Sequence, residues 1–308
     1  MRFGFAVPAY GDGADGAAVR ELVAAGEELG FESAWFPDHV AIPDYATAVN
    51  LSTPFLEPLA ACAWGLGATS RLRFGTDVLV APYRHALLVA AMAGTIGRLA
   101  GDRLVLGVGI GYLRGEFEVL GAHYDDRASV TEDWVRTLRR PPEGYSVVDA
   151  PTPVPVWMGG NSARAVERAA LLGDGWHPLW LAPERYAAAR DRIVTIREEC
   201  GIGGAFTFSF SAGMTRFAAE PAGGWPPPPE RAPPGSEFRY APAAWTAPDG
   251  RPGLVGSPDD LVADLRLLAA AGVDHITLRF GTTDTAPLER FARDVMPAFP
   301  NPGTKLRH

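Results

Sequence analysis

Short apolar runs alternate along the chain with longer stretches in which apolar residues recur every three or four positions. Short runs of this kind are typical of buried β-strands, and the longer stretches are typical of amphipathic helices. In "GAAVRELVAAGEELG", for example, Val19, Leu22 and Val23 fall on one helical face and Gly30 follows as a stop. Strands are predicted at residues 2–7, 31–36, 71–80, 102–111, 154–160, 173–180, 205–213 and 273–280. Helices are predicted at residues 16–30, 56–68, 85–100, 114–121, 127–139, 162–173, 184–199, 257–272 and 286–299.

This alternation predicts an α/β fold of parallel strands with helical crossovers. Eight such repeats favour a (β/α)8 TIM barrel, a single domain over residues 1–308. A doubly wound open sheet is the alternative, and it fits less well because such sheets seldom carry eight regular βα units. Residues 214–256 interrupt the rhythm with many prolines and glycines. We expect no regular helix or strand there and interpret the segment as a long insertion, or lid, before the seventh helix.

Composition narrows the possible partners and location. The formal net charge of −8 argues against nucleic acid or an anionic membrane as the general partner. No apolar run reaches the ~18 residues of a membrane helix, and no signal-peptide pattern precedes the first strand, so we expect a cytoplasmic protein. The two cysteines, Cys62 and Cys200, are too far apart for a metal-binding spacing, and no metal site is predicted.

In a barrel of this kind the active site lies where the strands end. Asp38 and His39 follow the second predicted strand, Asp77 and Val78 lie in the third, and Tyr112 follows the fourth. His39 suits acid–base chemistry near neutral pH, Asp38 is a candidate to orient it, and Tyr112 is a candidate donor to a developing oxyanion. An ordinary structural histidine is the alternative for position 39. His177, at the end of the short sixth strand within residues 173–180, is a rival acid–base group.

Two glycine-rich segments also end strands. In "GVGIG", Gly109 and Gly111 either let a flat ring system approach the backbone or relieve crowding between strands, and the pattern alone does not separate these readings. In "WMGGNSARAVERA", the pair Gly159-Gly160 leaves a strand and Asn161 or Ser162 caps the next helix. The free N–H groups of that helix favour an anion such as a phosphate, with a plain tight turn as the alternative.

Several of these segments together resemble the bacterial-luciferase-like flavin and deazaflavin oxidoreductases, and the likeness covers almost the whole chain. It rests on "GFESAWFPDHV", "LRFGTDVLVAPYRHALLVA", "DRLVLGVGIGYLRGEFEVLG", "RASVTEDW", "PVPVWMGGNSARAVERAALLGDGWHP" and "AGVDHITLRF". The branch that uses the deazaflavin coenzyme F420 is the most similar. In its sugar-phosphate dehydrogenases a glutamate stands where this chain has Tyr112, so the resemblance does not imply that activity.

The resemblance implies a flavin-shaped cofactor at the barrel mouth. Its phosphate would lie near Gly159, Gly160, Asn161 and Ser162, beside the ends of the strands at Gly109 and Gly111. A bulge with a non-proline cis peptide, which would map to Asp77-Val78, backs the ring in this family. The pair Asp38-His39 would lie beside the redox carbon and the substrate.

Three functions are compatible with these features. The first is an F420-dependent oxidoreductase that transfers a hydride between the deazaflavin and a small, apolar organic substrate. The second is a monooxygenase that uses reduced flavin mononucleotide (FMN) and oxygen, with a flavin reductase as partner. The third is a cofactor-binding relative without turnover. The resemblance also implies a possible homodimer, because dimers are common in this family.

Overall fold

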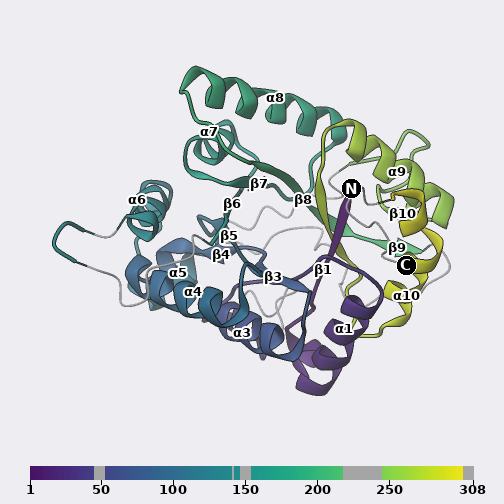
Figure 1. Ribbon diagram of the computed structural model, residues 1–308, viewed down its shortest axis with the longest axis horizontal. Helices are drawn as coiled ribbons and strands as arrows, with labels where there is room; N and C mark the ends of the chain where they lie inside the picture. Colours follow the sequence, from purple (N-terminus) through teal and green to yellow (C-terminus); the bar gives the residue numbers. More distant parts are fainter. Residues whose placement is uncertain (45–52, 141, 146–153, 218–244, 301–308) are drawn as a thin grey trace.

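The computed structural model describes residues 1–44, 53–140, 142–145, 154–217 and 245–300. Within them, parallel strands close into an eight-position barrel, which confirms the predicted (β/α)8 fold. The order around the barrel is β1-β2-β3-β5-β6-β7-β8-β11, and β11 pairs back with β1. Figure 1 shows these strands in the middle of the molecule with the helices around them. The strands are β1 (Arg2–Ala6), β2 (Ser33–Phe36), β3 (Arg73–Thr76), β4 (Leu79–Val80), β5 (Leu104–Gly109), β6 (Val156–Gly159), β7 (Gly175–His177), β8 (Thr207–Met214) and β11 (His275–Arg279).

The third barrel position is divided, although the sequence predicted one continuous strand over residues 71–80. Both β3 and β4 pair with β5, and between them lies a cis peptide bond joining Asp77 to Val78. The cis bond implied by the family resemblance is therefore present at the expected place.

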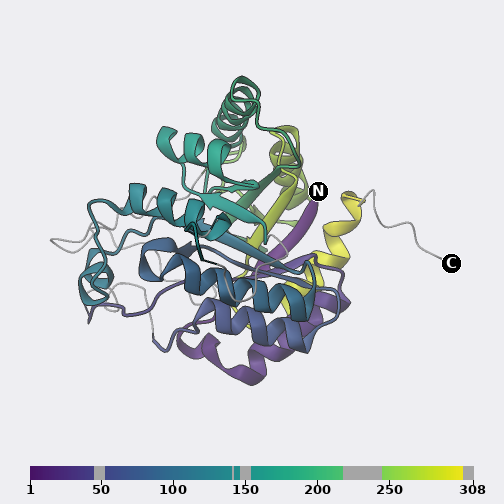
Figure 2. The same ribbon diagram turned by 60° about the vertical axis from the view of Figure 1, so that its left-hand side comes forward.

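The helices lie close to their predicted ranges because local signals define their starts. Asp15 accepts hydrogen bonds from the first-turn N–H groups of α1, and Ser257 and Asp260 form a capping box at α9. Figure 2 shows the helices from a second side of the barrel. They are α1 (Gly16–Glu28), α3 (Pro58–Ala68), α4 (Ala86–Ala100), α5 (Arg114–Val119), α6 (Arg127–Arg139), α7 (Ala163–Leu172), α8 (Pro183–Glu199), α9 (Pro258–Ala270) and α10 (Ala286–Asp294), with 3-10 turns η1 (Gly11–Ala14), η2 (Ala81–Tyr83) and η3 (Met296–Ala298).

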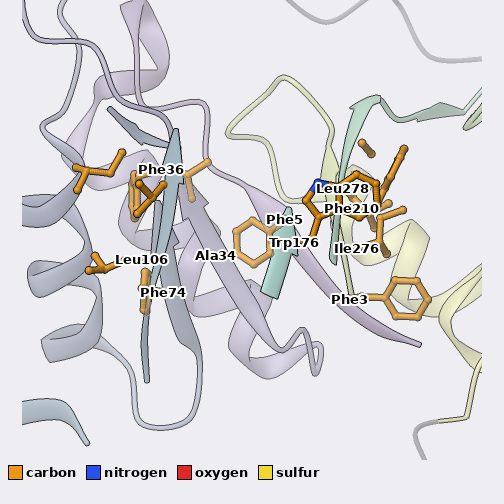
Figure 3. Packing of buried hydrophobic residues seen from close by; sticks show 14 of the residues in the cluster. Phe3, Phe5, Ala34, Phe36, Phe74, Leu106, Trp176, Phe210, Ile276 and Leu278 are labelled. Carbon is orange, nitrogen blue, oxygen red and sulfur yellow. The ribbon is translucent and has the colours of Figure 1, made fainter. Parts of the chain in front are cut away.

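The main hydrophobic core lies between the strands and these helices. Figure 3 shows large side chains from several strands packed together there, among them Phe36, Phe74 and Leu106. The rings of Phe36 and Phe74 stack at 6.2 Å. Gly65 of α3 provides room for Phe74, since a Cβ at position 65 would lie 2.3 Å from that ring. Helix α3 therefore sits close against the barrel wall.

The interior of the barrel has its own packing, based on large rings opposite glycines. Trp35 of β2 stacks on Trp157 of β6 at 5.2 Å, although these strands are not neighbours in the sheet. The contact therefore crosses the interior. A Cβ at Gly75 would lie 2.4 Å from the Trp35 ring, and one at Gly175 would lie 2.6 Å from Trp157. Glycines on the inner face make the space that these rings occupy.

The proline-rich segment differs from expectation at both ends. We predicted no strand within residues 214–256, but β8 continues to Met214, and β9 (Arg216–Phe217) pairs in parallel with β10 (Val255–Gly256). This pair joins the two ends of the insertion. The paired residues contain no proline, so the prediction was wrong at these ends because it took the composition of the whole segment for each of its parts. Residues 218–244, where the proline-rich tract falls, lie outside the described residues, so the lid stays a prediction.

Among the residues that the structure describes, none of the helices combines the length and the apolar character needed to cross a membrane.

Candidate functional site at the carboxyl ends of the strands

Because all the strands are parallel, the residues that follow them meet at one end of the barrel. Asp38, after β2, bonds to the N–H of Val80, and Val78 lies against Gly159 at the end of β6. The structure thus brings the segments around His39, Asp77 and Gly159 to the same end of the molecule, as the sequence predicted.

His39 is held on both sides of its imidazole ring. Nδ1 lies 2.7 Å from Oε2 of Glu116, and Nε2 lies 3.2 Å from the hydroxyl of Tyr112. A carboxylate at Nδ1 orients the ring and keeps the hydrogen on that nitrogen, which leaves Nε2 as the acceptor toward Tyr112. This is the arrangement of an oriented acid–base group.

Glu116 is a fully buried carboxylate surrounded by donors. The N–H groups of Val40 and Ala41 bond to Oε1 at 2.7 and 3.1 Å, and Tyr83 donates its hydroxyl to Oε2 at 3.2 Å, beside the His39 contact. Burial would raise the pKa of Glu116, but the hydrogen bonds from His39 and from the backbone outweigh it and lower that pKa. Glu116 is therefore ionised at neutral pH.

Tyr112 connects this buried pair to the outside. The residue is 39 % exposed, while its hydroxyl faces His39. Desolvation at that inner end and the negative charge of Glu116 raise the pKa of Tyr112, so the hydroxyl keeps its proton at neutral pH. Tyr112 therefore faces His39 as a protonated hydroxyl, and its predicted role as a donor to an oxyanion stays a prediction.

Asp38 does not take the role that we expected. Its carboxylate accepts two hydrogen bonds from Arg84, at 2.7 and 2.8 Å, and one from the N–H of Val80. Burial raises the pKa of Asp38, and the bidentate Arg84 opposes that rise. The expectation that Asp38 orients His39 is wrong: Arg84 and the N–H of Val80 hold its carboxylate, and Glu116 holds Nδ1 of His39 instead.

Asp77 is also buried and held by three donors. Nε2 of His177 lies 3.2 Å from Oδ1, while Ser211 and Arg279 donate to Oδ2 at 3.0 and 2.7 Å. Burial would raise the pKa of Asp77, but the hydrogen bond from His177 and the charge of Arg279 hold that pKa well below its usual range. The residue before the cis bond is therefore a fixed anion.

The glycines predicted to contact a cofactor leave room for neighbouring side chains of the protein. A Cβ at Gly109 would lie 2.4 Å from Val78, and one at Gly159 would lie 3.3 Å from the same side chain. Gly111 has φ +75°, which favours glycine, and a Cβ there would meet Val80 at 2.6 Å. The structure therefore supports the steric interpretation of these glycines, and their contact with a cofactor stays a prediction.

The turn from β6 into α7 keeps the features of an anion site. Ser162 is the N-cap and accepts from the N–H of Ala165, which decides between the two predicted caps. Asn161 instead exchanges two hydrogen bonds with the backbone of Leu179, so its side chain ties two loops together. The N–H groups of the two residues after the cap precede the intrahelical bonds and are available to an anion.

His177 is not an acid–base group at the mouth. It is fully buried, stacks on Trp35 at 4.7 Å, and has both ring nitrogens in hydrogen bonds with protein groups. Three aromatic side chains lie around His39. Phe55 is 5.1 Å from the imidazole ring and Tyr112 is 5.8 Å from it, and Tyr10 stacks on Phe55 at 5.2 Å.

Three charged residues of the site were missed by the sequence reasoning: Glu116, Arg84 and Arg279. All three lie in segments that carried the family resemblance, "GYLRGEFEVLG", "APYRHALL" and "AGVDHITLRF". For Arg279 a signal was available, because in "VDHITLRF" the polar residues His275, Thr277 and Arg279 alternate with apolar ones. A strand whose polar residues share one face can place them inside the barrel.

Comparisons with known proteins agree with this architecture. A sequence profile described as luciferase-like monooxygenase matches residues 1–221. An uncharacterized protein of Mycobacterium tuberculosis (strain ATCC 25618 / H37Rv) is 31% identical over 207 residues, which cover 58% of this chain and 71% of that protein. The FMNH(2)-dependent dimethylsulfone monooxygenase of Pseudomonas fluorescens (strain Pf0-1) is 28% identical over 176 residues, or 51% of this chain and 46% of that protein.

Two solved structures share the fold over nearly the whole length. An F420-dependent secondary alcohol dehydrogenase, solved with an F420-acetone adduct, has a TM-score of 0.73 at 17% identity and covers 98% of this chain and 99% of its own. The EDTA monooxygenase of Chelativorans sp. BNC1 has a TM-score of 0.74 at 12% identity, covering 96% and 92%. At these identities the likeness shows the fold alone.

Proposed function

Since this chain belongs to the luciferase-like monooxygenase family and is an oxidoreductase, we propose that it uses coenzyme F420 to transfer a hydride to or from a small, apolar organic substrate. The observation that carries the proposal is the geometry of His39, whose Nδ1 is held by buried Glu116 and whose Nε2 faces the hydroxyl of Tyr112. Hydride transfer to a carbonyl, or from an alcohol, needs a proton acid or base beside the reacting oxygen, and this group provides one.

The residues at the mouth fit a flavin-shaped cofactor with an anionic tail. The first turn of α7 offers free N–H groups and the positive end of the helix dipole to an anion. Gly160, at φ +101°, has no side chain that would cover these N–H groups. Ser162 and Gly160 would hold the phosphate. Val78, Gly109 and Gly159 would form the surface behind the ring, with Asp77 beneath it.

When bound, the deazaflavin would supply a two-electron hydride acceptor or donor. The chain's own residues would manage the proton. In the oxidative direction the substrate alcohol gives its hydroxyl proton to Tyr112 as Tyr112 passes its own to Nε2 of His39, and Glu116 stabilises the resulting imidazolium. In the reductive direction the same protons move back to the new alcohol. Tyr10 and Phe55 would provide the apolar surroundings that favour such a substrate.

A flavin-dependent monooxygenase is the second candidate. It is favoured by the similarity to a protein named an FMNH(2)-dependent dimethylsulfone monooxygenase. The same phosphate turn would hold FMN, a flavin reductase would supply the reduced cofactor, and oxygen would be the second substrate.

The test is titration of the purified protein with F420 and with FMN, followed through the fluorescence of each cofactor. We expect saturable binding of F420 and F420-dependent turnover of small alcohols or carbonyl compounds. His39→Ala should abolish turnover, whereas His123→Ala, at an exposed position, should not. Tight binding of FMN with no effect on F420 would overturn the proposal in favour of the monooxygenase. Binding without turnover by either route would favour a non-catalytic relative.

A further inference from the structure

A line of polar side chains runs through the inside of the barrel, where apolar residues usually fill the space. Each member is within hydrogen-bond distance of the next, and all are buried except Asp77, whose side chain is 5 % exposed. We call these side chains the lumen network; in order, they are Trp35, Ser33, His275, Ser209, His177 and Asp77. The network begins near the amino ends of the strands and ends at the Asp77 carboxylate, at the mouth.

The two ends of the lumen network set its direction. An indole N–H can only donate a hydrogen bond, and an ionised carboxylate can only accept one. Asp77 is ionised, since Arg279 donates to it at 2.7 Å alongside Ser211. With neutral rings, both ends are satisfied and each serine hydroxyl hydrogen has an acceptor when every hydrogen bond in the network points from Trp35 toward Asp77.

The first half of the network fixes the state of His275. Trp35 donates to Oγ of Ser33 at 2.8 Å, and in this direction the hydroxyl hydrogen of Ser33 is donated to Nε2 of His275, also at 2.8 Å. Nε2 consequently carries no hydrogen. His275 then donates from Nδ1 to Oγ of Ser209 at 3.0 Å. Burial lowers the pKa of His275 well below its usual value, which agrees with a neutral ring.

The second half fixes His177 in the opposite form. Ser209 already accepts from His275, so its hydroxyl donates to Nδ1 of His177 at 2.7 Å. His177 therefore carries its hydrogen on Nε2 and donates it to Oδ1 of Asp77 at 3.2 Å. Every donor and acceptor along the line has one partner, and both histidines are neutral.

A protonated His177 would satisfy the network less well. The Ser209 hydroxyl would have to turn toward His275, which would then donate from Nε2 to Ser33, an oxygen that already accepts from Trp35. Since Asp77 and Arg279 already balance each other's charge, the extra proton would also leave a net positive charge in the buried interior.

We propose that the lumen network holds His177 and His275 as neutral imidazoles of opposite tautomer and makes His177 a positioning residue for Asp77. Asp77 precedes the cis bond, and Val78 lies against Gly109 and Gly159. An Asp77 carboxylate fixed by His177 thus fixes the surface on which a cofactor ring would rest. This last step rests on the proposed function, whereas the tautomers do not.

Long-range 1H–15N correlation spectra of the imidazoles test the tautomers in the protein without cofactor. At pH 7 we expect the hydrogen of His177 on Nε2 and that of His275 on Nδ1, both rings neutral. Ser209→Ala removes the middle link and should turn one or both rings into a mixture of tautomers, while the signals of exposed His123 stay unchanged. The same tautomer on both rings, or a protonated His177, would overturn the assignment. Unchanged tautomers in Ser209→Ala would show that the network does not set them.

Two matched variants test the positioning of Asp77. In His177→Gln the amide N–H2 takes the place of Nε2 and still donates to Asp77, whereas in His177→Asn the amide reaches only toward Ser209. We expect His177→Asn to weaken cofactor binding by about tenfold or more, whichever of F420 and FMN the wild type binds. This is the expected effect of losing one hydrogen bond to a charged group. His177→Gln should recover most of the lost affinity. Ser209→Ala serves as the second measurement if neither variant folds, and it should weaken binding as well.

Equal binding by the two variants and the wild type would contradict the positioning role and leave the proposed function intact. A wild type that binds neither cofactor would overturn the positioning role and the proposed function together. The spectra without cofactor would still decide the tautomers in that case.

Discussion

Oε2 of Glu116 lies 2.7 Å from Nδ1 of His39, although the two residues are 77 positions apart in the chain. Helix α5 carries Glu116 under the segment that follows β2, where the N–H groups of Val40 and Ala41 also bond to it. One carboxylate therefore fixes both the backbone after His39 and the orientation of its ring.

Glu116→Gln is expected to lower kcat by about 10²-fold with a smaller change in KM, because the neutral amide no longer stabilises the His39 imidazolium. Steady-state kinetics on an identified substrate would measure this. Glu118→Gln, on the exposed side of the same helix, is the matched control and should leave kcat unchanged. Equal kcat values for the two variants would show that Glu116 only supports the fold.

Tyr112→Phe removes the hydroxyl that faces Nε2 of His39 and keeps the ring. We expect kcat to fall by about tenfold or more, since general acid–base groups contribute on the order of 10²-fold or more and His39 would remain. Cofactor affinity should change little. Tyr145→Phe, at an exposed tyrosine, is the control. An unchanged kcat would remove Tyr112 from the proposed proton path.

Arg84→Ala should destabilise the protein by about 3–5 kcal/mol, because it leaves the Asp38 carboxylate buried without its bidentate partner. Urea unfolding would measure the free energy. Arg136→Ala breaks an exposed ion pair with Asp133 and should cost less than about 1 kcal/mol. Similar values for the two variants would mean that the Asp38–Arg84 pair is not an important support of the site.

The free energy of unfolding should fall by about 1 kcal/mol between pH 6.5 and pH 5.5. Burial lowers the pKa of His275 in the folded protein, whereas an unfolded histidine titrates near ~6.5. Below that pH the unfolded chain binds a proton that the folded protein excludes, so acidification favours unfolding. His275→Asn should flatten this dependence and His123→Gln should not. A flat wild-type curve in urea unfolding would contradict a neutral, buried His275.

Two glycines of helix α3 make a matched pair for packing. Gly65→Ala places a methyl group 2.3 Å from the Phe74 ring and should cost about 1–3 kcal/mol, whereas Gly67, with nothing within 4 Å, should tolerate alanine and gain about 0.5–1 kcal/mol from helix propensity. Thermal unfolding of the two variants would give opposite shifts in Tm. Shifts of the same sign would mean that α3 can move away from the barrel wall.

Local patterns were sufficient for much of the fold. The period of apolar residues predicted the elements and their order, and the caps that the structure shows at Asp15 and Ser257 are equally local, since such signals act within a few residues. Parallel strands then required that residues following them meet at one end, so His39, Asp77 and Gly159 could be placed together without a structure. The division of the third strand at Asp77 came from the family resemblance.

The partners of those residues were decided only by the tertiary structure. Sequence proximity suggested Asp38 for His39, but in the folded chain Asp38 pairs with Arg84 and His39 with Glu116 of α5. Inside the barrel, rings and hydroxyls from strands that are not neighbours meet because the sheet closes on itself. The sequence by itself determined the strands and helices, their order and which loops meet at the mouth. Closure of the barrel, which sets distances between residues far apart in the chain, determined which side chains face the interior and which of them touch.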